Sequence, residues 1–263
     1  MMLTGKVAVI YGAGGAIGGG VARAFASEGA RVFLTGRHLA PVDVVAEDVA
    51  AGGGSAETAE VDALDERAVG DHLRSVIDRA GRVDISFNAV GLPNAGILGV
   101  PLTDLDVEQF SQPIAAYTRS YFLTARPAAR HMVPNRTGVI MTVTALHART
   151  GIPLVGGYGP AMAAKEALTR DLSAELAPHG VRVLGIRPQA MPETPTIKDA
   201  FEPRAEASGA TWEQWQELLA ARTHGRRLLT LEETTNLAVF LASDRASGMT
   251  GTTVNLTMGS LDD

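Results

Sequence analysis

The sequence contains no cysteine. Disulfide bonds are therefore excluded, and so are zinc or iron–sulfur centres held by thiolates. The stretch before Lys6 lacks the basic segment and apolar core of a secretory signal. These absences favour a cytoplasmic protein with no metal centre.

Long apolar runs and basic stripes are missing as well. No apolar run approaches the roughly 20 residues that a membrane-spanning helix needs. The formal net charge of −6 is spread along the chain. Neither a membrane nor nucleic acid is therefore an expected partner, and a small-molecule substrate is.

The composition that remains is that of a globular enzyme-sized chain. Of 263 residues, 46% are apolar and 20% are charged, which is enough to bury a sizeable core. Proline- and glycine-rich patches are short and scattered, and we find no linker and no internal repeat. We expect one domain spanning residues 1–263.

A glycine-rich stretch from Lys6 to Gly29 organises the amino-terminal part. The apolar run Val7–Ile10 predicts a strand covered on both faces, and an amphipathic helix follows the glycines. Such a loop alone is also found in ordinary turns, but a second predicted strand at Arg31–Thr35 favours a dinucleotide site. The residues expected to hold the pyrophosphate are Gly12, Gly14, Gly15, Ile17 and Gly18.

The residue after the second strand predicts which cofactor binds. Enzymes of this architecture that use NAD place an acid there, to hold the ribose 2′-hydroxyl. Here the position is followed by Arg37, which suits a 2′-phosphate, so NADP(H) is favoured over NAD(H). The alternative is that Arg37 is a solvated loop residue.

Alternating strands and helices continue to the carboxyl terminus. They predict an α/β fold: a single-domain Rossmann fold with a doubly wound, seven-stranded parallel sheet and helices on both faces. A third predicted strand ends at Asp62. The four strands predicted after it span Val83–Phe87, Gly138–Val143, Val181–Ile186 and Thr253–Leu256. The further predicted helices span Pro41–Ala51, Val107–Met132, Pro160–Leu176 and Leu231–Ala242, with another opening at Asp65 and Glu66.

Three motifs resemble the short-chain dehydrogenase/reductase family. Gly12, Ala16 and Gly18 are similar to its GxxxGxG fingerprint, with alanine at the middle position. Asn88-Ala89-Val90-Gly91 is similar to its NNAG motif, and Leu168–Val183 resembles its helix and strand after the active site almost residue for residue.

This resemblance implies further cofactor contacts. Asp62, with Ala63 beside it, would touch the adenine ring, although a lone Asp after a strand is otherwise a helix cap. Asn88 would hold the central sheet together. The residues implied to pass beside the cofactor are Ala89, Gly91 and Pro188.

The family's catalytic positions fall on mostly different residues here. Members use a tyrosine, a lysine four residues later, a serine on the preceding strand and an asparagine on the long helix. The alignment implied by the resemblance places the first three at Tyr158, Met162 and Ala145, and the asparagine on or beside Tyr117. Tyr158 alone keeps its role, and Ala145 and Met162 become expected pocket residues.

A second alignment involves the enoyl-thioester reductase branch of the family. Tyr158 and Lys165 have its Tyr-x6-Lys spacing, and the segments that begin at Asn88 and Thr142 also resemble it. Colinear alignment to that branch, however, again places the lysine at Met162 and places the tyrosine at Val155. Lys165 is thus either a catalytic residue that reaches back to Tyr158 or a lysine facing solvent or an interface.

Without the adjacent lysine, tyrosine chemistry favours reduction. An unperturbed tyrosine has a pKa near 10, so about one in a thousand is ionised at pH 7, too few for a general base. A neutral hydroxyl can still polarise a carbonyl or enone oxygen. The alternative is that Tyr158 is packed at a helix start beside Gly156 and Gly157.

Other pocket residues are expected around the fifth strand and in the variable segment. His147 follows that strand and could face the pocket, or could be solvated. Residues 188–224 depart from the family's pattern and predict a substrate lid. Trp212 and Trp215 within it indicate an apolar or ring-shaped ligand, or equally a subunit contact.

Two functions remain open from the sequence. One is an NADP(H)-dependent oxidoreductase that reduces a carbonyl or activated alkene of a small apolar substrate. The other is a catalytically lapsed member that serves as a dinucleotide-binding sensor or scaffold subunit. The resemblance also implies a homodimer or homotetramer, paired through the helices at Val107–Met132 and Pro160–Leu176.

Overall fold

The computed structural model describes residues 1–92, 98–207 and 209–261. Its centre is one sheet with the strand order β3-β2-β1-β4-β5-β6-β7, in which every neighbouring pair is parallel. The strands are β1 (Val7–Tyr11), β2 (Arg31–Gly36), β3 (Ser55–Glu60), β4 (Ile85–Asn88), β5 (Gly138–Val143), β6 (Val181–Pro188) and β7 (Thr252–Leu256). The predicted doubly wound parallel sheet is confirmed.

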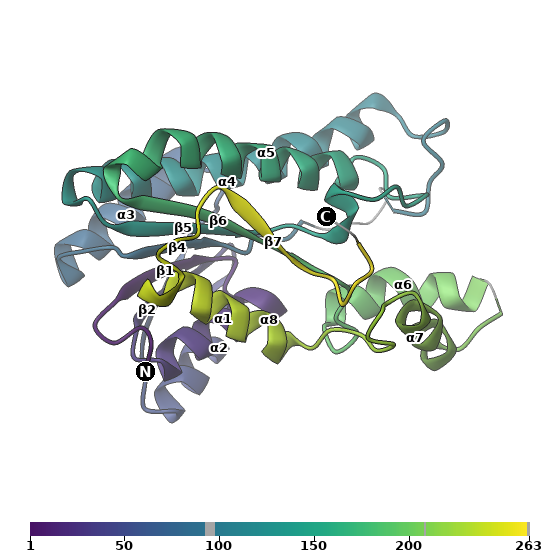
Figure 1. Cartoon of the computed structure of the whole chain (residues 1–263), viewed down its shortest axis with the longest axis horizontal. Helices are drawn as coiled ribbons and strands as arrows, with labels where there is room; N and C mark the ends of the chain where they lie inside the picture. The colour runs from purple at the N-terminus through teal and green to yellow at the C-terminus, as the bar shows by residue number, and fades with distance from the viewer. Residues whose placement is uncertain (93–97, 208, 262–263) are drawn as a thin grey trace.

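Helices cover both faces of the sheet (Figure 1). One face carries α1 (Ala16–Ser27), α2 (Leu39–Ala51) and α8 (Leu231–Ala242), and the other carries α3 (Glu66–Ala80), α4 (Val107–Asn135) and α5 (Tyr158–Leu176). Two further helices, α6 (Pro195–Ala207) and α7 (Trp212–Ala221), project beyond one end of the sheet. Short 3-10 turns, η1 to η3, lie at Leu146–Ala148, Ala177–His179 and Asp244–Ala246.

Alternation along β1 shows how the two cores form. Ala8 and Ile10 pack into the apolar cluster under α1, α2 and α8, while Val9 and Tyr11 pack into the cluster under α3 and α4. Because successive side chains of a strand point to opposite faces, one apolar run serves both layers. Burial on both faces fixes the register and brings the carboxyl ends of all seven strands to one edge.

Several predicted boundaries were wrong by two or three residues. The helices predicted to begin at Pro41 and Pro160 begin at Leu39 and Tyr158. Both prolines lie in the first helical turn, where a backbone N–H has no partner to lose, so proline does not mark the first residue.

Other boundaries shift at strand and helix ends. The fourth strand is Ile85–Asn88 rather than Val83–Phe87, because Asn88 continues the register with Tyr11 and Thr142. The third strand ends at Glu60, before Asp62, and α4 runs on to Asn135. Among the described residues, no helix combines the length and apolarity required to cross a membrane.

Candidate dinucleotide and active site

The glycine loop between β1 and α1 is shaped so that only glycine fits at two positions. Gly12 has φ +79°, and a Cβ there would lie 2.6 Å from the Ala89 carbonyl oxygen. A Cβ at Gly18 would overlap the Gly12 carbonyl oxygen. The backbone of the loop therefore lies directly against the end of β4. A loop of this shape before a helix N-terminus is the cradle that a pyrophosphate requires.

The remaining loop residues leave the helix N-terminus accessible. Gly14 and Gly15 are exposed, and Gly15 is the N-cap residue of α1 without a side-chain cap. Ala16 is the first helical residue, and it and Ile17 are half-buried. The unsatisfied amides and the dipole of α1 favour an anion at this end.

The adenosine side of the site holds one basic and one acidic side chain. Arg37 follows β2 and is exposed, and none of the described residues forms a hydrogen bond or an ion pair with its guanidinium. Asp62 is exposed, and its Oδ1 accepts a hydrogen bond from the Leu64 N–H at 2.9 Å. The cap of α3 is Asp65, which accepts from the N–H of Arg67 at 2.8 Å, so the alternative of Asp62 as that cap is wrong. Ala63, between them, is buried.

Asn88 ties the end of β4 to its neighbours. Its Nδ2 donates to Thr124 Oγ1 of α4 at 3.1 Å, and its carbonyl oxygen accepts from Thr142 Oγ1 of β5 at 3.3 Å. The next residue, Ala89, donates its N–H to the Tyr11 carbonyl at 2.9 Å. Gly91 is exposed beyond them. The role in holding the central sheet that the resemblance implied for Asn88 matches these contacts.

The end of β6 adds a residue that the sequence did not single out. Pro188 is the last residue of β6 and is buried. Gln189 follows where the family has glycine, and its side-chain Nε2 donates to Ser260 Oγ at 2.8 Å while its N–H donates to the Leu256 carbonyl at 3.0 Å. The start of the variable segment is thereby tied to the carboxyl-terminal segment. The departure from Pro-Gly was the only signal of this contact in the sequence.

Tyr158 is the first residue of α5 and is half-buried. Its ring packs edge-on against the rings of Tyr117, at 5.7 Å between centroids, and His147, at 5.2 Å. Burial, with a smaller contribution from Tyr117, raises the pKa of Tyr158 above its usual value. The hydroxyl is therefore neutral near pH 7 and suited to donate a hydrogen bond rather than to act as a base.

An apolar wall surrounds this hydroxyl-bearing ring. Met162 is buried and clusters with Tyr117 and Ala161, and the partly buried residues against this cluster are Leu92, Ile114, Ala145, Ala148 and Tyr158. The cluster thus includes the thioether of Met162 and the methyl group of Ala145, at the positions that the resemblance assigned to the family's lysine and serine. The Tyr117 hydroxyl is fixed by the N–H of Leu92 at 3.2 Å.

Lys165 lies in the interior, and the expectation of a lysine facing solvent or an interface is wrong. It is 1% exposed, and its Nζ donates to the Val143 carbonyl at 2.8 Å and to Asn88 Oδ1 at 3.5 Å. The helix α5 packs against α4 and β6, and the Lys165 side chain reaches the residues that end β4 and β5. Burial lowers the pKa of Lys165 to about 7.

A buried ion pair beside Lys165 was missed from the sequence. Arg187 of β6 donates to both carboxylate oxygens of Glu166, at 2.7 and 3.0 Å, and Thr144 Oγ1 donates to Glu166 Oε1 at 3.1 Å. Both charged side chains are 3% exposed. The pair joins α5 to the ends of β5 and β6. A charged residue within the apolar run of β6 was the available signal.

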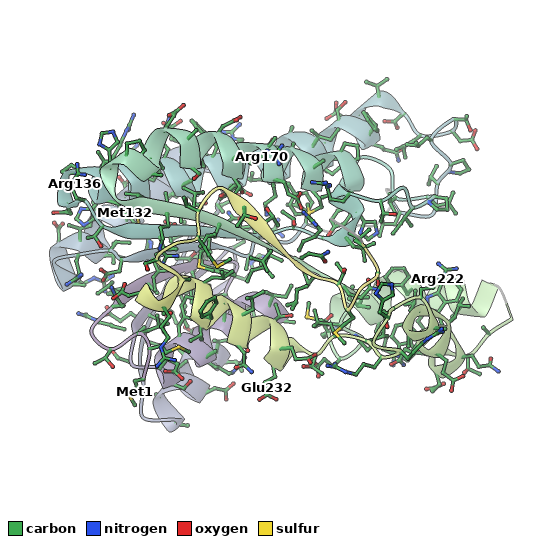
Figure 2. The ribbon with its side chains drawn as sticks, in the orientation of Figure 1. Met1, Met132, Arg136, Arg170, Arg222 and Glu232 are labelled. Carbon is green, nitrogen blue, oxygen red and sulfur yellow. The ribbon has the colours of Figure 1, made fainter. Side chains whose placement is uncertain are left out.

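The predicted lid at residues 188–224 includes α6 and α7. Arg222, directly after α7, lies at the opposite end of the molecule from Met1 and Arg136 (Figure 2). Trp212 and Trp215 are half-buried in α7, which packs against α6. Among the described residues, neither tryptophan belongs to the apolar cluster around Tyr158.

Taken together, the fold and the site define a dinucleotide-binding protein of the oxidoreductase class. A family model described as enoyl-(acyl carrier protein) reductase matches residues 12–260. The chain belongs to the short-chain dehydrogenase/reductase family, whose fold binds NAD(P).

Relatives and solved structures agree with this membership. The chain is 31% identical to D-beta-hydroxybutyrate dehydrogenase of Rhizobium meliloti (strain 1021), over 97% of this chain and 98% of the relative. It is similar to the structure of NAD+-bound xylitol dehydrogenase, with a TM-score of 0.89 and 26% identity over 99% of this chain and 100% of the other. A short-chain type dehydrogenase/reductase from Mycobacterium marinum is 32% identical, with a TM-score of 0.84 over 99% of this chain and 97% of the other.

Proposed function

We propose that this protein is an NADP(H)-dependent reductase of a carbonyl or activated alkene in a small apolar substrate. The observation that carries the proposal is Tyr158, a neutral hydroxyl in an apolar wall at the carboxyl edge of the sheet. Such a group can donate to a developing oxyanion but is a poor base for oxidising an alcohol. The wall accommodates apolar substrate atoms and excludes water.

The residues present fit the cofactor. The cradle at Gly12 and Gly18, which a Cβ would fill, supports a pyrophosphate at the start of α1. Arg37, which is exposed, would hold the 2′-phosphate, and Asp62 and Ala63 would border the adenine. When bound, NADPH supplies the hydride. Ala89, Gly91 and Pro188 would border its nicotinamide half.

The chain's own part in the reaction is orientation and proton donation. The substrate oxygen accepts a hydrogen bond from the Tyr158 hydroxyl, and as hydride reaches the electrophilic carbon the proton of Tyr158 passes to the substrate. After the product leaves and solvent enters the site, the phenolate is reprotonated from water. Met162, Ala145 and Tyr117 fix the substrate by contact, and this positioning supplies the remaining rate enhancement.

The outer parts of the site complete the proposal. His147 packs on Tyr158 and would border the substrate, and Trp212 and Trp215 would cover it from the lid. We assign Lys165 to the floor of the site, because its Nζ is bound to the strand ends. A cytoplasmic homodimer or homotetramer remains our prediction.

One observation favours a second candidate function. The buried Met162 and the neighbouring Ala145 lie at positions where the resemblance implies two groups on which family chemistry depends. A lapsed member that binds dinucleotide as a sensor or scaffold subunit would tolerate both replacements. This candidate predicts cofactor binding without turnover.

Turnover of NADPH on a panel of ketones and enones tests the proposal. We expect the wild type to reduce at least one panel member, and Tyr158→Phe to lose about 100-fold in kcat while its Kd for NADPH changes less than threefold. Tyr11→Phe is the matched control, since the Tyr11 hydroxyl is buried and has no hydrogen-bond partner among the described residues. Tight NADPH binding with no turnover on any panel member would favour the lapsed function.

A further inference from the structure

Lys165 is a buried cation whose surroundings lack a counter-ion. Its Nζ is held by two carbonyl oxygens, those of Val143 and the Asn88 side chain, and lies 5.7 and 5.8 Å from the ring centroids of Tyr117 and Tyr121. Among the described residues, no carboxylate forms an ion pair with it. Carbonyl dipoles and aromatic ring faces stabilise an ammonium group only in part. The charge of Lys165 therefore interacts electrostatically with other charged groups that bind close to it.

The strand ends that bind Lys165 indicate which half of the cofactor would lie close to it. Val143 and Asn88 end β5 and β4, on the opposite side of β1 from β2 and β3. The glycine loop after β1 would hold the pyrophosphate, and Arg37 and Asp62 place the adenosine over β2 and β3. A dinucleotide that crosses the carboxyl edge therefore extends its nicotinamide over β4 and β5, above Lys165.

We propose that the buried ammonium of Lys165 makes the cofactor site discriminate between the two charge states of nicotinamide, so that the neutral reduced ring binds more tightly than the cationic oxidised ring. The inference rests on the proposed function, and it deepens it by giving the site a bias toward reduction. Two unit charges about 10 Å apart in protein interact by an amount that corresponds to roughly a tenfold change in affinity. Lys165 is thus a specificity-determining residue that acts through space, without contact to Tyr158.

Apart from His147, the charged and titratable groups near Lys165 that follow are neutral or paired. Tyr117 and Tyr121 on α4 are kept neutral, because burial raises the pKa of both hydroxyls. On α5 and β6, Glu166 and Arg187 neutralise each other. The ring of His147 packs on that of Tyr158, and its effect is tested by a separate variant.

Because the pKa of Lys165 lies near neutrality, the discrimination depends on pH. Below pH 7 the side chain is an ammonium and repels the oxidised ring. Above pH 7 it becomes neutral and the repulsion is lost. The 2′-phosphate is common to both cofactor forms, so its titration cancels in the ratio of their dissociation constants.

The test measures Kd for NADP+ and for NADPH at pH 6.0 and 8.5 in the wild type, Lys165→Met and Lys165→Arg. We expect the ratio Kd(NADP+)/Kd(NADPH) to fall about tenfold between these pH values in the wild type. In Lys165→Met the ratio should be low and independent of pH. In Lys165→Arg the ratio should be high at both pH values. Lys6→Met, at the amino edge of the sheet, is the matched control, and His147→Asn should keep the wild-type ratio.

Two results would overturn the proposal, and they are distinguishable. If both cofactors bind and the ratio is the same in wild type and Lys165→Met, the inference fails while the proposed function stands. If neither cofactor binds, the proposed function fails and the inference fails with it.

A second readout uses only the wild-type protein, so it does not depend on whether a variant folds. The lysines of the chain are Lys6, Lys165 and Lys198, so ¹³C-lysine labelling gives few signals to assign. NADP+ should shift the titration midpoint of Lys165 downward relative to NADPH by about one pH unit, the reciprocal of the tenfold affinity effect. Equal midpoints with the two cofactors would contradict the proposal.

Discussion

The two halves of the carboxyl edge differ in whether backbone or side chains form them. Around β1 to β3, the glycine cradle and the start of α1 retain the family's geometry, with one alanine at the helix start. Around β4 to β6, Tyr158 lies against an apolar cluster that includes Met162 and Ala145, and Lys165 is buried about two turns further along α5. Backbone shape thus determines the half at the glycine loop, whereas side chains determine the half around Tyr158.

This difference indicates that cofactor binding and proton transfer can change independently in this fold. A cradle made of backbone atoms depends on the absence of side chains, so it survives many substitutions elsewhere. A proton-transfer site depends on a few side chains, so a few substitutions change its reaction. The predictions below should separate the two halves.

The largest expected effect comes from placing a lysine and a serine at the positions that the resemblance assigns to the family's catalytic groups. Met162→Lys with Ala145→Ser should raise carbonyl reduction by about 10²- to 10⁴-fold, because an ammonium one turn from Tyr158 assists proton transfer. Met162→Leu with Ala145→Ser is the control that adds the hydroxyl without the charge. A folded, NADPH-binding double variant that stays inactive on substrates that the wild type reduces would show that the natural chemistry uses a different geometry.

Closing the cradle should abolish binding in the other half. In Gly18→Val the side chain would overlap the Gly12 carbonyl, and we expect NADPH affinity to fall at least about 100-fold, measured by calorimetry. Gly248→Ala, where a Cβ meets nothing within 4 Å, should bind as the wild type does. Unchanged affinity in Gly18→Val would place the pyrophosphate elsewhere.

Arg37→Ala should separate the two cofactors. Loss of a charge-assisted contact of about 1.5–3 kcal/mol should weaken NADPH by about tenfold or more and leave NADH nearly unchanged. Arg170→Ala, on the exposed side of α5, controls for the loss of a positive charge. Equal losses for NADPH and NADH would reject the assignment of Arg37.

The smallest effect concerns the pH dependence of stability. Burial, followed by the nearby charge of Arg79, lowers the pKa of His72 on α3 to about 4. The unfolded chain therefore binds a proton that the folded chain excludes, and the free energy of unfolding should fall by about 1 kcal/mol from pH 6.5 to 5.5. Chemical denaturation of His72→Leu should lack this loss, whereas exposed His179→Gln should keep it. If the free energy of unfolding of His72→Leu falls by the same amount, a group other than His72 causes the pH dependence.

The sequence predicted the parts of the molecule that local patterns determine. The apolar run of β1 and the glycine spacing were sufficient for the sheet and for the glycine loop before α1, whereas the role of Tyr158 as a proton donor stays a prediction. The burial of Lys165 and the Glu166–Arg187 pair were not predictable, because they depend on which face of α5 meets α4, β5 and β6. Such contacts join residues distant in sequence, and helical periodicity alone does not say which polar residue is turned inward.

The most direct test of the account is a titration of the wild-type protein with NADPH and NADH, followed by nicotinamide fluorescence. We predict saturable binding of both cofactors, with NADPH at least about tenfold tighter because of the proposed contact between Arg37 and its 2′-phosphate. Absence of binding, or tighter binding of NADH, would contradict the claim that the binding half of the site is intact and built for NADPH.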